Sequence, residues 1–254
     1  MTNELLREQR GAVLILTMNR PEARNAINVA LAEALDEALT TADADDSVRV
    51  VVVTGADDKA FSAGMDLKAF ARGEVPFTAN GFAGVTEHPF SKPLLCAANG
   101  SAFAGGFEIL LRCDLVVASE EAAFGIPEVK RGLFAGAGGL LRLPRRIPRA
   151  VATEMALTGD PISAARAYEL GLINAVVPST DVLSATVALA ERIAANAPLA
   201  VRLSKGILDE TLDMTLAEGW VRNKADFEKV AVSHDALEGA IAFAEKRAPV
   251  WQGR

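Results

Sequence analysis

Apolar residues along the chain form short runs that predict the strands of a buried parallel sheet. The run VRVVVVTG at 48–55 is continuous, rich in branched residues and bounded by glycine. Such a run is typical of a strand with both faces covered, because a half-exposed strand alternates apolar and polar residues. Four further runs predict strands in the same way, at 12–18, 92–100, 114–119 and 173–178.

Helical periodicity occupies the segments between these runs. Leu31, Leu35 and Leu39 recur at helical spacing within 29–39, directly after Asn28, a residue type that favours the N-cap. Strands that alternate with helices indicate an α/β core with right-handed crossovers. Further helices are predicted at 106–113, 149–158 and 163–170.

The pattern changes after Pro178, where strands give way to amphipathic helices. An all-helical tail after an α/β core suits a second layer or an oligomerisation element. We divide the chain into an α/β core at 1–195 and a helical oligomerisation region at 196–254. The amphipathic segments lie at 181–196, 199–212, 215–232 and 234–247.

Charge and composition narrow the chemistry. The chain has 254 residues and a net charge of −7, which disfavours a general nucleic-acid binder because phosphates are neutralised by clustered Lys and Arg. The two histidines, His88 and His234, are far apart and neither cysteine has a C-x-x-C partner, so no metal site is predicted. A G-x-S-x-G elbow is absent, which disfavours a Ser-His-Asp hydrolase. If the chain is an enzyme, carboxylates and backbone groups are the expected catalysts.

The cysteines and the chain start indicate a compartment. Cys96 and Cys113 lie in apolar surroundings, which predicts buried, reduced thiols in a reducing cytosol. The start MTNELLREQRG has no apolar signal-peptide region, and no apolar run approaches the roughly 18 residues of a membrane helix. We expect a cytoplasmic protein without a membrane partner.

Three glycine-containing turns stand out, at 60–70, 99–113 and 124–144, and the first two directly follow predicted strands. Glycines there let the backbone approach a ligand and present free N–H groups. In the second turn they open a helix, which places the N–H of Gly105 at the positive end of the helix dipole. The glycines equally suit plain turns, and none forms a dinucleotide fingerprint or a phosphate loop.

Two glutamates lie beside these turns. Glu108 falls in the first turn of an apolar helix, where it can simply satisfy the helix's own amides. Glu128 follows a proline in a loop, where it can be a surface carboxylate paired with Lys130 or Arg131. Taken together, and with glycine N–H donors nearby, they look like a general acid/base pair beside an oxyanion hole.

These residues belong to motifs that resemble the crotonase (enoyl-CoA hydratase/isomerase) family over essentially the whole chain. Within that family the closest resemblance is to the enoyl-CoA hydratase and carnitinyl-CoA dehydratase branch. The matching segments are NRPEARNAI (19–27), FSAGMDLKAF (61–70), NGSAFAGGFEILLRCDLVVAS (99–119), FGIPEVKRGL (124–133), AGGLLRLPRRI (137–147), TGDPISAARAYELGLINAVVP (158–178) and EGAIAFAEKRAPVW (238–251).

The resemblance implies a crotonase-type superhelix of ββα units with a C-terminal helical trimerisation region. It also implies a homotrimer or a hexamer built as a dimer of trimers. The implied substrate is an acyl-CoA thioester, with coenzyme A as part of the substrate and no separate cofactor. The oxyanion hole would consist of the N–H groups of Met65 and Gly105, with Glu108 and Glu128 as catalytic carboxylates. Glu128 would be the main base and acid at the water, and Glu108 would position and assist it.

Coenzyme A carries several negative charges while the chain is net acidic, so its binding must rest on local groups. A lysine often follows the proline of the first motif, whereas this chain has Glu22, which puts a phosphate contact there in doubt. The resemblance places Ala23, Arg24, Ala26, Ala63, Gly64, Asp66, Leu67 and Lys68 along the coenzyme A path. The candidate cations are Arg24, Lys68, Lys246 and Arg247.

Other departures affect the acyl side of the site. Ala104 stands where many members have glycine, and the pair 135–136 replaces a frequent proline-containing pair. Phe82 and Phe134 are candidates to touch an acyl chain. The basic run RLPRRIPR at 142–149 predicts a helix-end surface or a subunit contact.

Retention of both glutamates favours an enoyl-CoA hydratase-type lyase, which adds water reversibly to an α,β-unsaturated acyl-CoA thioester. Carnitinyl-CoA dehydratase activity and enoyl-CoA isomerisation, which can run on one carboxylate, are alternatives. A crotonase-fold protein that binds acyl-CoA without turnover is a third.

Overall fold

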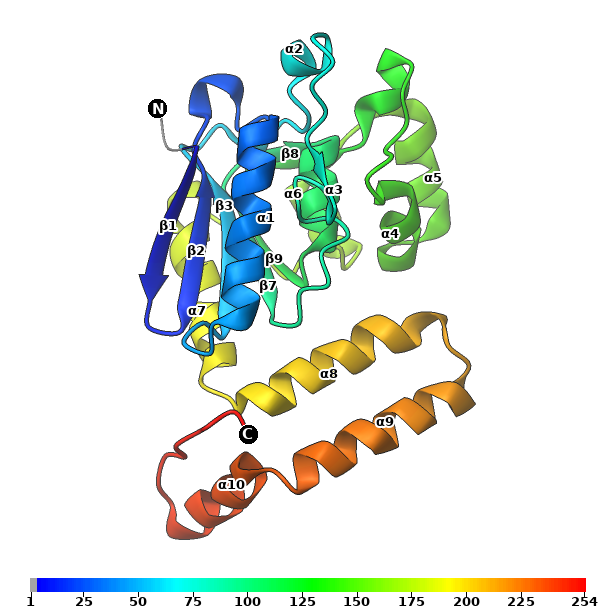
Figure 1. Cartoon of the computed structure of the whole chain (residues 1–254). Coiled ribbons are helices and arrows are strands. Elements are labelled where there is room, and N and C mark those ends of the chain that lie inside the picture. The colour runs from blue at the N-terminus through cyan, green and yellow to red at the C-terminus, as the bar shows by residue number, and fades with distance from the viewer. Residues whose placement is uncertain (1–3) are drawn as a thin grey trace.

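A six-stranded sheet forms the centre of the protein in a computed structural model that describes residues 4–254 (Figure 1). The strand order is β1-β2-β3-β7-β9-β12, with β1 antiparallel to β2 and all other neighbours parallel. All five predicted strands are confirmed, and β1 adds an antiparallel edge that the sequence did not predict. Their bounds are β1 Leu5–Arg10, β2 Val13–Met18, β3 Val50–Gly55, β7 Leu94–Ala98, β9 Leu115–Ser119 and β12 Ala175–Val177.

A second, smaller sheet has the order β11-β10-β8-β4. Strands β4, β8 and β10 each follow a strand of the large sheet after a few residues, so the chain repeatedly steps from one sheet to the other. This stepping is the repeated ββα unit of the predicted superhelix. The bounds are β4 Ala60–Ser62, β8 Ser101–Phe103, β10 Ala123–Gly125 and β11 Ile162–Ser163, and a short hairpin joins β5 Phe77–Thr78 to β6 Gly81–Phe82.

Helices cover both faces of the large sheet. Val51 and Val53 of β3 pack into the core that includes α1, whereas Val50 and Val52 pack against α7 on the opposite face. The continuous apolar run of this strand therefore reflects burial on two sides. The helices of the core are α1 Val29–Ala44, α2 Leu67–Phe70, α3 Gly105–Arg112, α4 Gly139–Arg146, α5 Arg149–Thr158, α6 Ala164–Glu169 and α7 Val182–Ala194.

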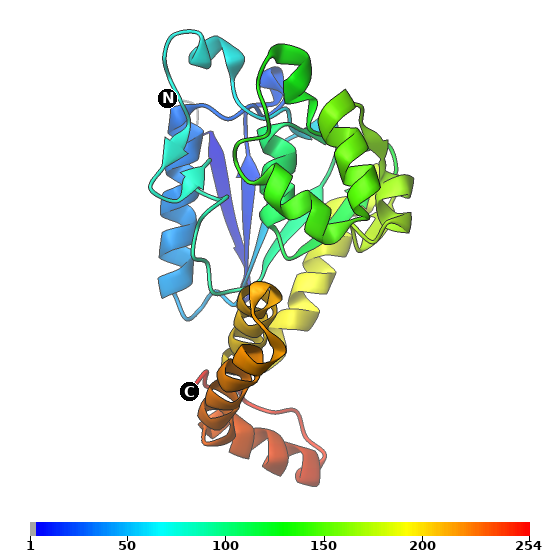
Figure 2. The same cartoon turned by 90° about the vertical axis from the view of Figure 1, so that its right-hand side faces the viewer.

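The predicted all-helical tail consists of α8 (Pro198–Glu210), α9 (Leu216–Ala231) and α10 (His234–Glu245). It projects away from the core, with α8 and α9 side by side (Figures 1 and 2). Large apolar side chains on it face solvent, with 68% of Phe227 and 88% of Phe243 exposed. The tail therefore leaves an apolar surface that this chain does not cover.

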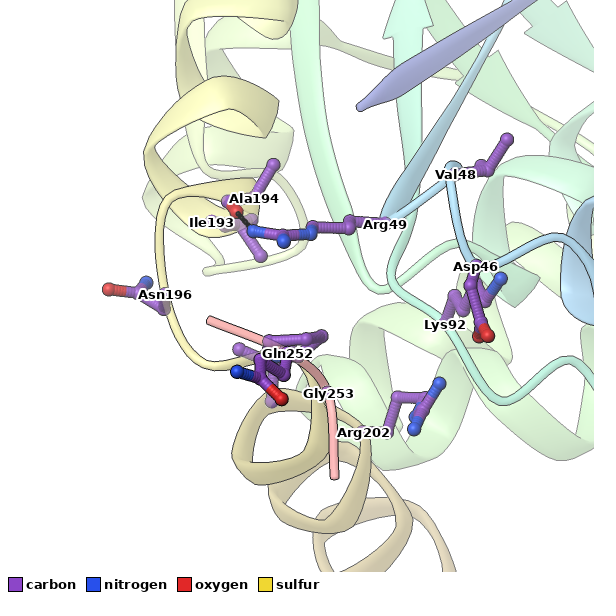
Figure 3. Close-up of a pocket in the computed structure, with 12 residues that line it drawn as sticks. Asp46, Val48, Arg49, Lys92, Ile193, Ala194, Asn196, Arg202, Gln252 and Gly253 are labelled. Atoms are coloured by element: carbon purple, nitrogen blue, oxygen red, sulfur yellow. Dashed lines mark hydrogen bonds between the residues drawn. The ribbon is translucent and has the colours of Figure 1, made fainter. Parts of the chain in front are cut away.

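The C-terminal segment returns to the corner between α7 and α8. The indole Nε1 of Trp251 donates to the carbonyl oxygen of Ala195 at 2.8 Å, and the buried Asp235 carboxylate accepts from the next two backbone N–H groups. Figure 3 shows the small pocket beside this segment, where Arg49 donates to the carbonyl oxygen of Ala194 and Lys92 lies nearby. These contacts fasten the base of the tail to the core.

Two further findings concern the cysteines and the length of the apolar helices. Cys96 and Cys113 are buried and free, as their apolar surroundings indicated. No helix within residues 4–254 combines the length and the apolar character needed to cross a membrane.

Candidate active site

A pocket of about 660 Å³ lies where the glycine-containing turns meet the first loop after β2. It is lined on one side by apolar and aromatic side chains and on another by the start of α3 and by the short helix η2 (Pro127–Arg131). The predicted site residues that line this pocket are Arg24, Ala63, Met65, Leu67, Gly105, Glu108 and Glu128.

The two predicted oxyanion donors come from loops that touch each other. Gly64 has a φ of +88°, and a Cβ built there would lie 2.8 Å from the backbone nitrogen of Gly105. Only glycine fits this close approach and this backbone conformation. Among the described residues, the N–H groups of Met65 and Gly105 donate to no protein acceptor. Both N–H groups are thus available to a ligand oxygen at the N-terminal end of α3.

Asp66 holds the loop that contains Met65. Its carboxylate accepts hydrogen bonds from the N–H groups of Lys68 and Ala69, which caps α2, and it forms an ion pair with Arg20 at 3.0 Å. A hydrogen bond from the N–H of Ile27 to the neighbouring carbonyl at 64 ties the same loop to the first motif. Asp66 is therefore placed behind the pocket wall rather than on it.

Four other residues predicted along the coenzyme A path lie near the pocket without lining it. Gly64 is the contact between the two loops, and Ala26 is buried behind the first motif. Ala23 ends the short helix η1 (Pro21–Ala23), and Lys68 lies exposed in α2. Of these four residues, Lys68 is the one with an exposed charged side chain that can contact an anionic group of a ligand.

Glu108 is almost fully buried, with 3% of the residue exposed. Its Oε1 accepts hydrogen bonds from the N–H groups of Ala137 and Gly139, each at 2.8 Å. Burial raises the pKa of Glu108, while these N–H donors and the charge of Arg142 act in the opposite direction. Glu108 thus takes its donors from a distant segment, not from the first turn of its own helix.

Glu128 lies in the short helix η2, directly after Pro127. Its Oε2 is buried and has no hydrogen-bond partner among the described residues. Burial raises the pKa of Glu128 to about 7, and the negative charge of Glu108 adds to this effect. A carboxyl group with such a pKa can both accept and return a proton near neutral pH. The Glu128 side chain forms no ion pair with Lys130, which binds Asp160 instead.

Arg142 belongs to the basic run predicted to form a helix-end surface or a subunit contact, and it also contacts its own chain. Its side chain is half-buried, and Nη2 donates to the carbonyl oxygen of Thr86 at 2.6 Å. Ala137 and Gly139, the donors to Glu108, were also not predicted as site residues. Both lie in the glycine-containing turn at 124–144, so the turn was visible in the sequence, but nothing local linked it to Glu108.

Phenylalanines form the apolar side of the pocket. Phe82 and Phe134 both line it, as expected, together with Phe70, Phe77 and Phe103. Phe82 packs so closely on Gly105 that a Cβ there would lie 2.5 Å from the Phe82 ring. Phe134 is 70% exposed and lies at the mouth.

The predicted cations separate into two groups. Arg24 lines the pocket, joined there by Lys130 and Arg131. Lys246 and Arg247 follow α10, the last helix of the tail, and do not line the pocket of their own chain. Arg247 pairs with Glu238 at 2.6 Å.

Metal ligands do not gather anywhere in the described part of the chain. No group of three or more His, Cys, Asp or Glu side chains there is arranged to hold a metal ion. The pocket itself is lined by Met65 and Gly105, whose N–H groups are free, and by Glu108 and Glu128, a set of groups that suits chemistry at a carbonyl compound.

Comparison with known proteins agrees with this geometry. Residues 8–254 match the family described as enoyl-CoA hydratase/isomerase. The chain is 42% identical over 262 residues to the carnitinyl-CoA dehydratases of Proteus mirabilis and Salmonella typhi, with 100% of each chain covered. An enoyl-CoA hydratase structure from Mycobacterium tuberculosis has 50% identity and a TM-score of 0.96, with 99% of each chain covered. A carnitinyl-CoA hydratase structure from Mycobacterium avium has 49% identity and a TM-score of 0.81, with 100% of each chain covered. The chain belongs to the enoyl-CoA hydratase/isomerase family.

Proposed function

We propose that this protein is a lyase that adds water reversibly to an α,β-unsaturated acyl-CoA thioester. The observation that supports this most directly is the placement of Glu108 and Glu128 in one pocket with the free N–H groups of Met65 and Gly105. Isomerisation can proceed with one carboxylate, so a pocket that keeps two favours a reaction that must also activate water.

The two N–H groups would bind the thioester oxygen. Attack of water at Cβ moves negative charge onto that oxygen as an enolate forms, and preorganised donors stabilise this charge. Each such donor contributes roughly 10²–10³ in rate. The position of Gly105 at the start of α3 adds the positive end of a helix dipole.

Glu128 would move the proton. Its carboxylate accepts a proton from the attacking water and then returns it to Cα, so the enzyme ends in the state in which it began. Its pKa of about 7 suits both transfers. Glu108, held through Oε1 by two N–H groups, would orient the water with its other oxygen.

Coenzyme A would bind through local cations along the rim of the pocket. Arg24, Lys130 and Arg131 line the pocket, and Lys68 lies exposed at the adjacent helix α2. Lys246 and Arg247 would require a neighbouring subunit to reach a ligand, because they end the tail of their own chain far from the pocket. The apolar side of the pocket, with Phe82 and Phe134, would receive the acyl chain.

A panel of enoyl-CoA thioesters tests the reaction. Hydration removes the absorbance of the conjugated thioester and adds the mass of one water to the substrate, whereas isomerisation leaves the mass unchanged. We expect Glu108→Gln and Glu128→Gln each to lose about 10²–10⁴ in kcat. Hydration at near wild-type rates in both variants would rule out the assigned roles, and acyl-CoA binding with no turnover would favour a non-catalytic protein.

Carnitinyl-CoA dehydratase activity is the second candidate, because the curated relatives given above bear that name. Phenylalanine rings in the pocket can contact a quaternary ammonium group through cation–π interactions. Including crotonobetainyl-CoA in the panel separates the two, since the ratio of its kcat/KM to that of a plain enoyl-CoA measures the preference.

We also infer a homotrimer or a dimer of trimers in the cytoplasm. The exposed apolar side chains of α9 and α10 support association of tails from several chains, and free buried cysteines suit a reducing compartment. Light scattering on the intact protein gives the oligomeric state. Phe243→Asp should lower it, whereas Glu228→Gln, at a polar position of α9, should not.

A further inference from the structure

Arg142 lies half-buried in α4, beside the turn at 137–139 that donates to Glu108. It has two neighbours with backbone carbonyl groups: Nη2 donates to Thr86 at 2.6 Å, and Nη1 lies 3.4 Å from the oxygen of Ala137. A Cβ at Gly138 would lie 2.1 Å from Nη1, so the guanidinium packs directly against this turn. Among the described residues no carboxylate oxygen comes within ion-pair distance of it.

The same turn orients Glu108. The N–H groups of Ala137 and Gly139 point to Glu108 Oε1, while the carbonyl of Ala137 faces Arg142. The turn is therefore held between a carboxylate on one side and a guanidinium on the other. A shift of the turn would move both donors to Glu108 together, since they lie two residues apart.

Arg142 interacts electrostatically with Arg112 of α3, Arg146 of its own helix, Glu87 of the loop after β6, and Glu108. The groove that it lines also holds the charged side chains of Asp114, Arg145, Asp209 and Asp213. Glu108 faces Arg142 and the second carboxylate, Glu128. The positive charge of Arg142 favours the ionised form of Glu108, which burial disfavours.

We propose that Arg142 is a positioning residue for the hydration reaction: it fixes the turn that orients Glu108 and supplies the positive charge that this carboxylate faces. The proposal rests on the proposed function for its effect on rate, but its effect on Glu108 is a property of the protein alone. Loss of the guanidinium therefore has two separate consequences, one for turnover and one for the charge state of Glu108.

Arg142→Met tests the charge, Arg142→Lys restores it, and Arg145→Met is a matched control because Arg145 is exposed on the same helix and pairs with Asp213. With the best substrate of the panel, we expect Arg142→Met to lower kcat about ten-fold or more while KM changes less than about three-fold. Arg142→Lys should recover part of kcat, and Arg145→Met should match the wild type. If Arg142→Met changed KM alone, the proposal would be overturned. It would also be overturned if Arg142→Lys folded correctly but recovered none of the lost kcat.

A titration separates this proposal from failure of the proposed function. In a Glu128→Gln background Glu108 is the one carboxylate that lines the described pocket, and infrared difference spectra against the Glu108→Gln, Glu128→Gln double variant follow its ionisation. Arg142→Met should move this titration to higher pH, and Arg145→Met should not. An unmoved titration in a protein with unchanged circular dichroism would refute the proposal, whether or not the wild type hydrates any thioester.

Discussion

Glu128 shares its pocket with Glu108: burial raises the pKa of Glu128 to about 7, and the negative charge of Glu108 adds to the rise. The two carboxylates are nevertheless held differently. Glu108 binds two N–H groups through one oxygen, whereas Glu128 keeps an oxygen buried without a partner. Such different surroundings push two pKa values apart, which is how one site obtains a fixed carboxylate and a proton carrier.

The pH dependence of turnover follows from this relationship. The ionised form of Glu128 begins the reaction, so kcat/KM for hydration should rise with pH and level off above a midpoint near 7. Dehydration should show the same rise, because the net reaction takes up no proton and its equilibrium is independent of pH. Initial rates in both directions across pH measure the two curves.

Glu108→Gln is the informative variant for this curve. It removes a charge that raises the pKa of Glu128, so the midpoint of its residual activity should fall below that of the wild type. The midpoint belongs to the coupled pair, which makes the direction of the change the measured quantity. A midpoint that stays in place would show that the two carboxylates do not interact.

Stability should respond to the same group with a defined sign. The folded-state pKa of Glu128 lies above its ordinary value of 4.5, so ionisation costs free energy in the folded state and stability falls as pH rises from about 4.5 to 7. Glu128→Gln cannot ionise. As pH rises over this range, the free energy of unfolding of Glu128→Gln should therefore increase relative to that of the wild type. The increase should be about 1–2 kcal/mol, after a discount for the partial exposure of the side chain. Denaturant unfolding at pH 5 and 8 measures the gain, and an equal difference at both pH values would contradict it.

A side chain at position 64 should disturb the site in two ways. It would strain the backbone of residue 64, and it would collide with the backbone of Gly105. Gly64→Ala places a methyl group 2.8 Å from the Gly105 nitrogen, where the ligand oxygen would bind. We expect kcat to fall about 10²–10³-fold, the effect of losing one oxyanion donor. Gly73→Ala is the matched control, since Gly73 has a similar φ of +85° and nothing within 4 Å of a built Cβ. If both variants lost similar activity, backbone strain alone would explain the loss in Gly64→Ala.

The sequence predicted the long elements well because their periodicity extends over enough residues. The helix at 149–158 has the predicted bounds, and the strand at 48–55 lies within two residues of its observed limits. Strands β4, β8 and β10 have three residues each, too few to show an alternation of period two. Helix α4 was missed because Pro144 and its basic residues interrupt the apolar pattern.

The candidate site could be predicted only in part, for a related reason. Glu108, Glu128 and the glycine turns were visible because each lies in a short local motif. The donors to Glu108 come from segments 29 and 31 residues further along the chain, and no local pattern pairs these positions. Arg142 lies among other arginines of a basic run, and burial, which the sequence does not display, distinguishes it from its exposed neighbour Arg145.

Ala104 provides a prediction about backbone strain at the start of α3. It immediately precedes α3 with a φ of +51°, a conformation that costs a non-glycine residue about 1–3 kcal/mol. Ala104→Gly removes this strain and adds roughly 0.5–1 kcal/mol of chain entropy to the unfolded state, so we expect a net gain of about 1 kcal/mol in the free energy of unfolding. Turnover should be preserved, because the N–H of Gly105 keeps its place against Gly64. Urea unfolding with an unchanged slope measures the gain, and a lower midpoint would mean that the Ala104 methyl group contributes more through packing than its backbone strain costs.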